Sequence, residues 1–497
     1  MPGTLLFRDA TVWTAEAGAA ECGSLLVEDG RIARVADGID PPAGAEIVEC
    51  GGGFVMPAFV DAHTHLVRHG VALLRLDLSR ATTLAEAIEA VRERAKMTPE
   101  GGWVVGAGWD ESKWDAPTMP SRADLDLAAG AHPTLVGRVD MHMGVLNTAG
   151  LKAVGLDPVE YPAGHVREEE FYRAGDAVEP APETLAKAVG VASRRAWELG
   201  IGSCHVVADM SDLAALETAR ADGVLGVRTS LYLRESALDA AVQRGLRRGW
   251  GDAWIRVNGC KLFADGSIGS RTAAVSRGYA DDPRQKGRLV YPPGRLAVHV
   301  RRAHEAGLQL AVHCIGDAAI GEALAPLEAL RDPEGRHRLE HAELFTDEHA
   351  HRMRAAGIVA SMQPNFIGEW GHAGQMYEAR LGKWVVEAHN RLATLRNTGV
   401  HLAFGSDHMP WGPLYGVHCA ANAPSPAQRL SVEDALRAYT SGAAWAGFAE
   451  REVGTLAPGM LADVLVLDAD PRRDPSRAKE RKVRCLAIDG RVVVQRS

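Results

Sequence analysis

Short apolar runs, separated by stretches with helical periodicity, recur through most of the chain. Eight of these runs begin near residues 54, 201, 227, 256, 308, 337, 357 and 400. Apolar runs that alternate with helical intervals indicate parallel strands covered on both faces. A strand with its helix takes about 30 residues in an eight-stranded barrel, and most of the intervals fit that spacing. The pattern therefore predicts an α/β fold of the (β/α)8 TIM-barrel type.

The two ends of the chain alternate apolar runs with tight turns instead. Residues 23–35 and 483–494 each contain two such runs joined by Asp-Gly, which signals a β-hairpin. Neither end is long enough to bury a core alone. We therefore expect residues 1–56 and 445–497 to form one small composite β-sandwich domain, with the barrel in residues 57–444.

The first interval of the predicted barrel is much longer than the others. Between residues 65 and 201 the chain has strand-like and helical stretches of its own, which predicts an insert module over residues 67–195. Loops that follow barrel strands lie on the active-site face, and loops of this length are commonly functional. We expect the insert to roof the mouth of the barrel.

Six residues suited to a metal site close the apolar runs. The first run ends in His63-Thr-His65, and residues i and i+2 of a strand point the same way. Imidazole suits zinc and its neighbours. The later runs end at Lys261, His313, His341 and Asp407. Because catalytic residues of TIM barrels lie at the C-terminal strand ends, these residues predict a metal centre there. Histidines such as His304 are interpreted as ordinary core or surface residues.

Longer motifs around these residues carry a family resemblance. They are GAGWD at 106–110, RVDMH at 138–142, KLFADGSIGSRTAA at 261–274, VHCIGDAA at 312–319 and RHRLEHA at 336–342. The sequence resembles, nearly end to end, the amidohydrolase superfamily, whose barrel enzymes use His-x-His, Lys, His, His and Asp from strands one, four, five, six and eight. Within it, the chain is most similar to the amidohydrolase family 3 branch, which contains N-substituted formamide deformylase.

The resemblance implies a centre of two divalent metal ions. His63, His65 and Asp407 would hold the first ion, and His313 and His341 the second. Lys261 would capture CO2, and the resulting carbamate would bridge both ions. Zinc is the expected metal, although manganese, iron and cobalt accept the same ligands. The alternative for Lys261 is an ordinary ion pair with Asp265.

Asp407 is also the predicted catalytic residue. One carboxylate oxygen can ligate weakly while the other takes the proton of a metal-bridging water. Asp407 would then deliver that proton to the leaving amine, which must not depart as an anion.

Softer candidates for substrate contact lie in the insert and after later strands. Arg138, Asp140 and His142 have alternate spacing, so that one face could present all three side chains. Aromatic rings in these regions could line a pocket, although such rings more often serve packing. These aromatic candidates are Trp109, Phe366, Trp370 and Trp411.

The amino-acid composition limits which partners and which cellular compartment we expect. The chain has 497 residues, with 64 acidic against 55 basic side chains and a net charge of -9, which argues against nucleic acid or an anionic membrane as partner. There is no signal-peptide pattern and no apolar run of about 18 residues. Seven scattered cysteines without a Cys-x-x-Cys pair suit a reducing cytoplasm. We expect a cytoplasmic enzyme with a small-molecule substrate, and a homodimer would match the family.

The predicted function is hydrolysis of an amide or formamide carbon-nitrogen bond, through a metal-bridging hydroxide, in a small and mostly uncharged N-substituted substrate. Two alternatives stay open. A heterocycle deaminase of the same superfamily typically lacks the lysine on strand four and has a glutamate shortly after the histidine of strand five. Here Lys261 is present and His313 is followed by Cys-Ile-Gly-Asp. A non-catalytic scaffold on the same fold would be expected to have lost ligands, and all six are intact.

Overall fold

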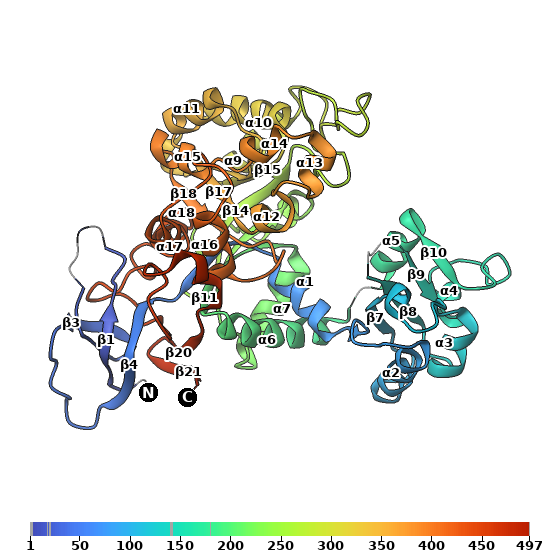
Figure 1. Ribbon diagram of the computed structural model, residues 1–497, viewed down its shortest axis with the longest axis horizontal. Coiled ribbons are helices and arrows are strands. Elements are labelled where there is room, and N and C mark those ends of the chain that lie inside the picture. The colour runs from blue at the N-terminus through green and yellow to red at the C-terminus, as the bar shows by residue number, and fades with distance from the viewer. Residues whose placement is uncertain (1–2, 17, 19–20, 140–142, 179, 497) are drawn as a thin grey trace. The chain divides into compact units, whose positions relative to one another are not determined.

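The computed structural model describes residues 3–16, 18, 21–139, 143–178 and 180–496. The chain divides into two compact units, the first made of Met1–Val67 with Ala192–Ser497 and the second of Arg68–Val191. Figure 1 labels the elements of both. The predicted substrate contacts Asp140 and His142 lie outside the described residues.

A parallel barrel sheet forms the centre of the first unit. Its strands run in the order β18-β17-β16-β15-β14-β12-β11-β5, and the short β13 (Trp250–Gly251) pairs with β14 from outside this path. The barrel strands are β5 (Phe59–Thr64), β11 (Ile201–Ala208), β12 (Arg228–Arg234), β14 (Ile255–Phe263), β15 (Gln309–Cys314), β16 (Arg338–His341), β17 (Val359–Met362) and β18 (Leu402–Phe404). The two outer strands are linked where the Asp407 N–H donates to the carbonyl of His63 at 2.9 Å. This arrangement confirms the predicted α/β barrel.

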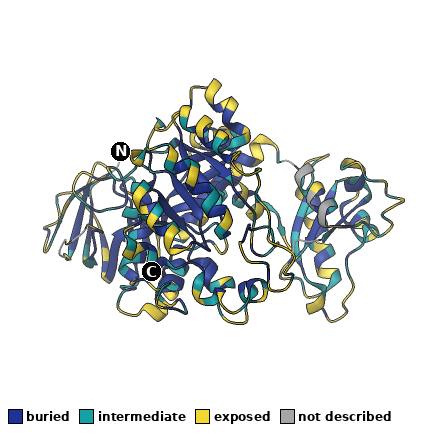
Figure 2. Cartoon of the chain, turned by 90° about the horizontal axis from the view of Figure 1, so that it is seen from above, coloured by how far each residue is buried: buried dark blue, intermediate teal, exposed yellow. Residues whose placement is uncertain are grey.

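Helices surround the barrel and fill the loops after its strands. Those alternating with the strands are α7 (Met210–Ala221), α8 (Leu238–Gln243), α9 (Leu296–Glu305), α10 (Asp317–Ala329), α11 (Asp347–Ala356), α15 (Leu392–Thr398), α17 (Val432–Ala438) and α18 (Ser441–Ala446). The loops after β17 and β18 carry α12 (Asn365–Trp370), α13 (Met376–Leu381), α14 (Val385–Ala388) and α16 (Pro413–Ala421). The barrel strands are buried, while the covering helices expose their outer faces (Figure 2).

Local sequence signals set the ends of these helices. At α11 the side chain of Thr346 accepts the backbone N–H of His349 at 3.2 Å, which caps the first turn. The same helix ends at Gly357, whose φ of 66° is the left-handed conformation that glycine adopts without strain. Such caps let the chain turn sharply from a helix into the next barrel strand.

The two ends of the chain share one seven-stranded sheet, in the order β21-β20-β19-β4-β1-β2-β3. Its strands are β1 (Leu5–Val12), β2 (Ser24–Glu28), β3 (Arg31–Ala36), β4 (Glu46–Pro57), β19 (Val464–Leu467), β20 (Val483–Ile488) and β21 (Arg491–Gln495). The long β4 pairs with β1 on one side and with β19 on the other. Its core therefore takes side chains from both ends, including Phe7 and Val466.

The apolar run predicted as the first barrel strand is divided between two sheets. Residues 54–57 complete β4 in the seven-stranded sheet, and the barrel strand β5 begins only at Phe59. The predicted start near residue 54 was therefore wrong by five residues. Both parts of the run are buried. The hydrophobicity of the run therefore does not indicate where the chain passes from one sheet to the other.

The second unit has a five-stranded sheet of its own, in the order β10-β9-β8-β7-β6. Its strands are β6 (Leu76–Asp77), β7 (Val104–Trp109), β8 (Thr134–Arg138), β9 (Met143–Leu146) and β10 (His165–Arg167). Four helices belong to it: α2 (Leu84–Met97), α3 (Arg122–Ala129), α4 (Thr148–Ala153) and α5 (Glu168–Ala177). Two further helices, α1 (Leu66–Leu74) and α6 (Pro182–Glu198), span the points where the chain passes between the units. None of the described helices is both long and apolar enough to cross a bilayer.

Candidate metal centre

The barrel brings the six predicted metal residues to one end of its strands. His63 lies near the end of β5 and His65 directly follows it, while His341 is the last residue of β16. Lys261 lies on β14 and His313 on β15. Asp407 comes three residues after β18. All these strands are parallel, so their C-terminal ends meet at one mouth.

Distances between the side chains define a compact cluster. Oδ1 of Asp407 lies 3.2 Å from Nε2 of His65 and 3.8 Å from Nε2 of His63. The ring centroids of His63 and His341 are 4.9 Å apart, and those of His313 and His341 are 4.6 Å apart. His63, His341 and Asp407 each offer a ligand atom, and these atoms lie within 4.8 Å of one another. This spacing would allow His63, His341 and Asp407 to hold a metal ion together.

Backbone strain is concentrated at this mouth. His341 has a φ of 71° and Asp407 a φ of 50°, and the residues that follow them, Ala342 and His408, are also left-handed at 41° and 58°. Such conformations are uncommon for residues with a side chain and cost about 1–3 kcal/mol each. Hydrogen bonds hold them in place, among them the one from the Ala342 N–H to the carbonyl of Cys314 at 2.9 Å. Two of the candidate metal residues thus have strained backbones.

Lys261 has the environment of an amine that can lose its proton. Its side chain is buried, and among the described residues Nζ has no hydrogen-bond partner. Burial lowers the pKa of Lys261 to about 8, although the negative charges of Glu340 and Asp407 oppose this shift. A neutral amine is therefore accessible near neutral pH, which is what reaction with CO2 requires.

Asp265, the alternative partner of Lys261, is engaged elsewhere. Its carboxylate accepts backbone N–H groups of Ala274, Ile315 and Gly316 at 2.9 to 3.0 Å. Burial raises the pKa of Asp265 to about 7, with these hydrogen bonds opposing the rise. The residue fixes the loops that follow β14 and β15, and it forms no ion pair with Lys261 in the described chain.

Burial favours the neutral form of His313 and His341, which is the form that binds metals. Nε2 of His313 donates to the carbonyl of Gly266 at 3.0 Å, which leaves the lone pair of Nδ1 for a ligand. Burial lowers the pKa of His313 to about 3 and that of His341 well below its usual value. Nδ1 of His341 is buried without a hydrogen-bond partner among the described residues. A buried nitrogen without a hydrogen-bond partner among the described residues fits the role of a metal ligand.

Asp407 is a carboxylate in this environment. Burial alone would raise its pKa, but the hydrogen bond with His65, together with the surrounding histidines, holds it below the usual value. Four imidazoles, one carboxylate and one lysine thus surround the mouth. This donor set fits divalent zinc, manganese, iron or cobalt.

A buried carboxylate behind the ligands holds the loop that carries Asp407. Oδ1 of Asp61 accepts the backbone N–H groups of His63 at 3.2 Å and Ser406 at 3.0 Å. Its Oδ2 accepts the indole Nε1–H of Trp411 at 3.1 Å. Trp411 also packs edge-on against His408, with ring centroids 4.4 Å apart. Trp411, predicted as a substrate contact, therefore supports the loop after β18.

Two of the predicted aromatic residues pack against the candidate metal residues. Phe366 stacks on His341 with a centroid distance of 5.9 Å and an interplanar angle of 8°. Trp370, which is half-buried, follows at 4.8 Å from Phe366. Both lie on α12, after β17. They form a row of packed aromatic rings that begins at a candidate ligand.

Trp109 and Arg138, the predicted substrate contacts in the described part of the insert, contact other residues of the second unit. Trp109 is fully buried in the hydrophobic core of the second unit, and its Nε1–H donates to Val136 at 3.4 Å. Arg138 pairs with Glu111 at 3.0 Å and lies over the Trp109 ring at 6.0 Å. These contacts give both side chains a packing role within the insert.

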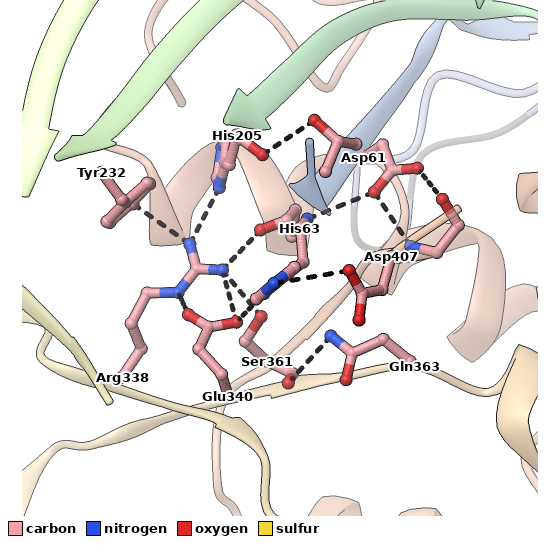
Figure 3. A network of polar contacts seen from close by, with 12 residues as sticks. Asp61, His63, His205, Tyr232, Arg338, Glu340, Ser361, Gln363 and Asp407 are labelled. Atoms are coloured by element: carbon pink, nitrogen blue, oxygen red, sulfur yellow. Dashed lines mark hydrogen bonds and ion pairs between the residues drawn. The ribbon is translucent and has the colours of Figure 1, made fainter. Parts of the chain in front are cut away.

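Sequence reasoning did not single out Arg338 and Glu340, which lie just before His341 on β16. Both are buried, and Glu340 accepts a hydrogen bond from Nδ1 of His63 at 2.5 Å (Figure 3). Two charged residues at alternate positions of an otherwise buried strand were the available signal, because such residues point together into the barrel.

A second group of histidines with a carboxylate lies near the opposite ends of the strands, where His337 precedes β16. It consists of His304, Asp332 and His337. Nδ1 of His337 accepts the N–H of Leu310 at 3.1 Å, so the neutral ring carries its proton on Nε2. That nitrogen faces Asp332 at 3.7 Å and has no lone pair for a metal. The group is a polar contact, in keeping with the interpretation of His304 from the sequence.

Comparison with known proteins agrees with this geometry. The model of a family described as the amidohydrolase family matches residues 46–494. The putative amidohydrolase YtcJ of Bacillus subtilis is 31% identical over 490 residues, which cover 91% of each chain. N-substituted formamide deformylase of Arthrobacter pascens is 26% identical over 94% of each chain. A solved structure of an uncharacterized metal-dependent hydrolase from Pyrococcus furiosus superposes with a TM-score of 0.83 at 30% identity, over 94% of this chain and 100% of that one.

Proposed function

Because the chain belongs to the amidohydrolase family, we propose that this hydrolase cleaves the carbon-nitrogen bond of a small N-substituted amide or formamide. The observation that carries the proposal is the meeting of six residues at one barrel mouth, with Nζ of Lys261 and Nδ1 of His341 buried and unpartnered among the described residues. The name of the Arthrobacter relative, a formamide deformylase, supports this class of bond.

The chain would hold two divalent ions. We assign His63, His65 and Asp407 to one and His313 and His341 to the other, with a carbamate on Lys261 between them. Zinc is our first choice of metal. Bound there, the ions would supply an activated water at neutral pH and polarise the substrate carbonyl.

Proton transfer falls to Asp407. One of its oxygens faces His63 and His65, which leaves the other oxygen for the attacking water. A carboxylate with a lowered pKa accepts a proton only transiently, so it passes that proton on to the leaving nitrogen. The amine then departs as a neutral molecule, which lowers the activation barrier to cleavage of the C–N bond.

The row of aromatic rings made by Phe366 and the half-buried Trp370 would contact the N-substituent. The row starts at His341, and aromatic rings favour an aromatic or alkyl group over a charged one. Burying that group would contribute roughly 25 cal/mol per Å² of apolar area, available for positioning the scissile bond.

Trp370→Ala is expected to raise KM for N-benzyl substrates by about tenfold, corresponding to a loss of about 1.4 kcal/mol of binding. KM for N-methylformamide should change little, because a methyl group does not reach the indole. Trp384→Ala is the matched control, since Trp384 is exposed and contacts Arg277 instead of Phe366. An equal rise in KM for both substrates would remove Trp370 from the pocket.

The proposed reaction is tested by incubating the zinc- or manganese-loaded protein with a panel of N-formyl and N-acyl amines and measuring released primary amine. We expect release from the N-substituted members and none from a His63→Ala, His341→Ala double variant. Ammonia released from aminated heterocycles, without amine release from the panel, would instead indicate a deaminase and refute the proposal.

A further inference from the structure

Arg338 and Glu340 form a buried ion pair inside the barrel that the proposed chemistry does not use. Each side chain is about 1% exposed. They occupy alternate positions of β16, so both point into the barrel, while His341 comes next at the mouth. Burying two charges costs several kcal/mol unless their hydrogen bonds are nearly complete. The presence of this buried pair therefore calls for a structural or functional explanation.

The hydrogen bonds of Arg338 are nearly complete and reach four other strands (Figure 3). Its guanidinium donates to the carbonyl of Ala62 on β5 at 2.5 Å, to Nδ1 of His205 on β11 at 2.9 Å, to the hydroxyl of Tyr232 on β12 at 3.1 Å and to Ser361 on β17 at 2.7 Å. The planar fork of donors is thus fixed in direction by the barrel wall. The guanidinium of Arg338 is therefore held in a fixed position and can orient the carboxylate of Glu340.

Glu340 lies between Arg338 and His63, a candidate metal ligand. One of its oxygens accepts Nε–H of Arg338 at 2.5 Å, and the other accepts Nδ1–H of His63 at 2.5 Å. Because the proton of the neutral imidazole is then on Nδ1, the lone pair is on Nε2. Nε2 is the nitrogen that faces Asp407. The carboxylate thus sets both the tautomer and the direction of the ring.

We propose that the Arg338–Glu340 pair is a positioning device that presents Nε2 of His63 as a preformed metal ligand and so sets the affinity of the centre for its metal. The inference rests on the proposed function only in taking His63 as a ligand. Carboxylates behind metal-binding histidines act in this way, and their removal typically weakens metal binding by about 10- to 100-fold. A pair that served only to hold the barrel together would affect stability and leave the metal affinity alone.

The test compares the metal affinity of Glu340→Gln with that of the wild type, by competition between the full-length protein and a chelator for Zn²⁺. We expect the dissociation constant to rise by about 10- to 100-fold. Asp463→Asn is the matched control, because it removes the carboxylate charge from a second buried arginine pair, Arg228–Asp463, which contacts none of the six predicted metal residues. It should lower thermal stability with a metal affinity within about twofold of wild type.

Glu340→Gln leaves Arg338 without a counter-charge, which can prevent folding. The double variant Arg338→Met, Glu340→Gln contains no unpaired buried charge and keeps similar volumes. It should therefore fold and still show the weakened metal binding. Wild-type affinity in the double variant, or an equal loss in Asp463→Asn, would overturn the inference.

The inference and the proposed function fail separately, since metal affinity is measured without substrate. A wild-type protein that binds metal tightly and cleaves no amide would refute the proposed reaction. The Glu340 comparison would still decide whether the pair positions His63.

Discussion

Lys261→Ala is expected to lower kcat by on the order of 100- to 1,000-fold, the loss typical of removing one electrostatic stabiliser of a transition state. The proposed carbamate carries negative charge to both ions, and without it the imidazoles of His313 and His341 are a weak site. Elemental analysis should show that most of the second metal is lost. Short carboxylates or bicarbonate added to the variant should restore part of the activity, because they can occupy the space of the carbamate.

Asp265→Asn is the control for this experiment. Asp265 accepts three backbone N–H groups in the loops that follow β14 and β15. Its replacement therefore disturbs the structure near Lys261 without removing the amine. It should keep both metals at reduced stability. A Lys261→Ala protein with two metals and full turnover would contradict the bridging role.

Asp407→Asn should lower kcat by about 100-fold or more, the range expected for a general acid-base group. The amide keeps the shape of the side chain and one oxygen toward His65, but it has no basic oxygen for the proton of the attacking water. Metal content should therefore fall less than in His63→Ala, which removes a ligand held by Glu340.

His408 is the next candidate if Asp407→Asn keeps a near-normal kcat. Its Nε2 already accepts the backbone N–H of His65 at 3.0 Å, which leaves that nitrogen unavailable for catalysis. The structure therefore favours Asp407. A kcat within about threefold of wild type in Asp407→Asn, set against the losses of acid-base groups, would place proton transfer elsewhere.

The barrel and its candidate ligands could be predicted because their signals are local. Each of His63, Lys261, His313 and His341 ends or nearly ends a short apolar strand, and parallel strands bring such ends together whatever the helices between them do. The assignment of each ligand to an ion stays a prediction.

Features decided by packing could not be predicted in this way. The run that ends at His63 changes sheet between Pro57 and Phe59, yet every residue near the change is buried and apolar. Aromatic residues present a similar difficulty. Trp109 lies in the core of the insert, while Trp370 packs on Phe366 beside the candidate metal residues. Nothing in the neighbouring sequence separates these two outcomes.

Arg338 and Glu340 show a further limit. Their charges identify them as unusual in a barrel strand, but their partners lie 23 to 277 positions away in the chain, such as Ser361 and His63. Which residue receives the carboxylate depends on the closed barrel. Only the three-dimensional arrangement connects Glu340 to a candidate ligand.

Metal stoichiometry tests the central claim most directly. The full-length protein, reconstituted with Zn²⁺ or Mn²⁺ and freed of excess ion, is measured by elemental analysis beside a His63→Ala, His341→Ala double variant prepared in the same way. We expect two ions per wild-type chain and a large loss in the variant. A wild-type protein that retains no divalent metal, or a variant that retains both ions, would contradict the proposed two-metal centre.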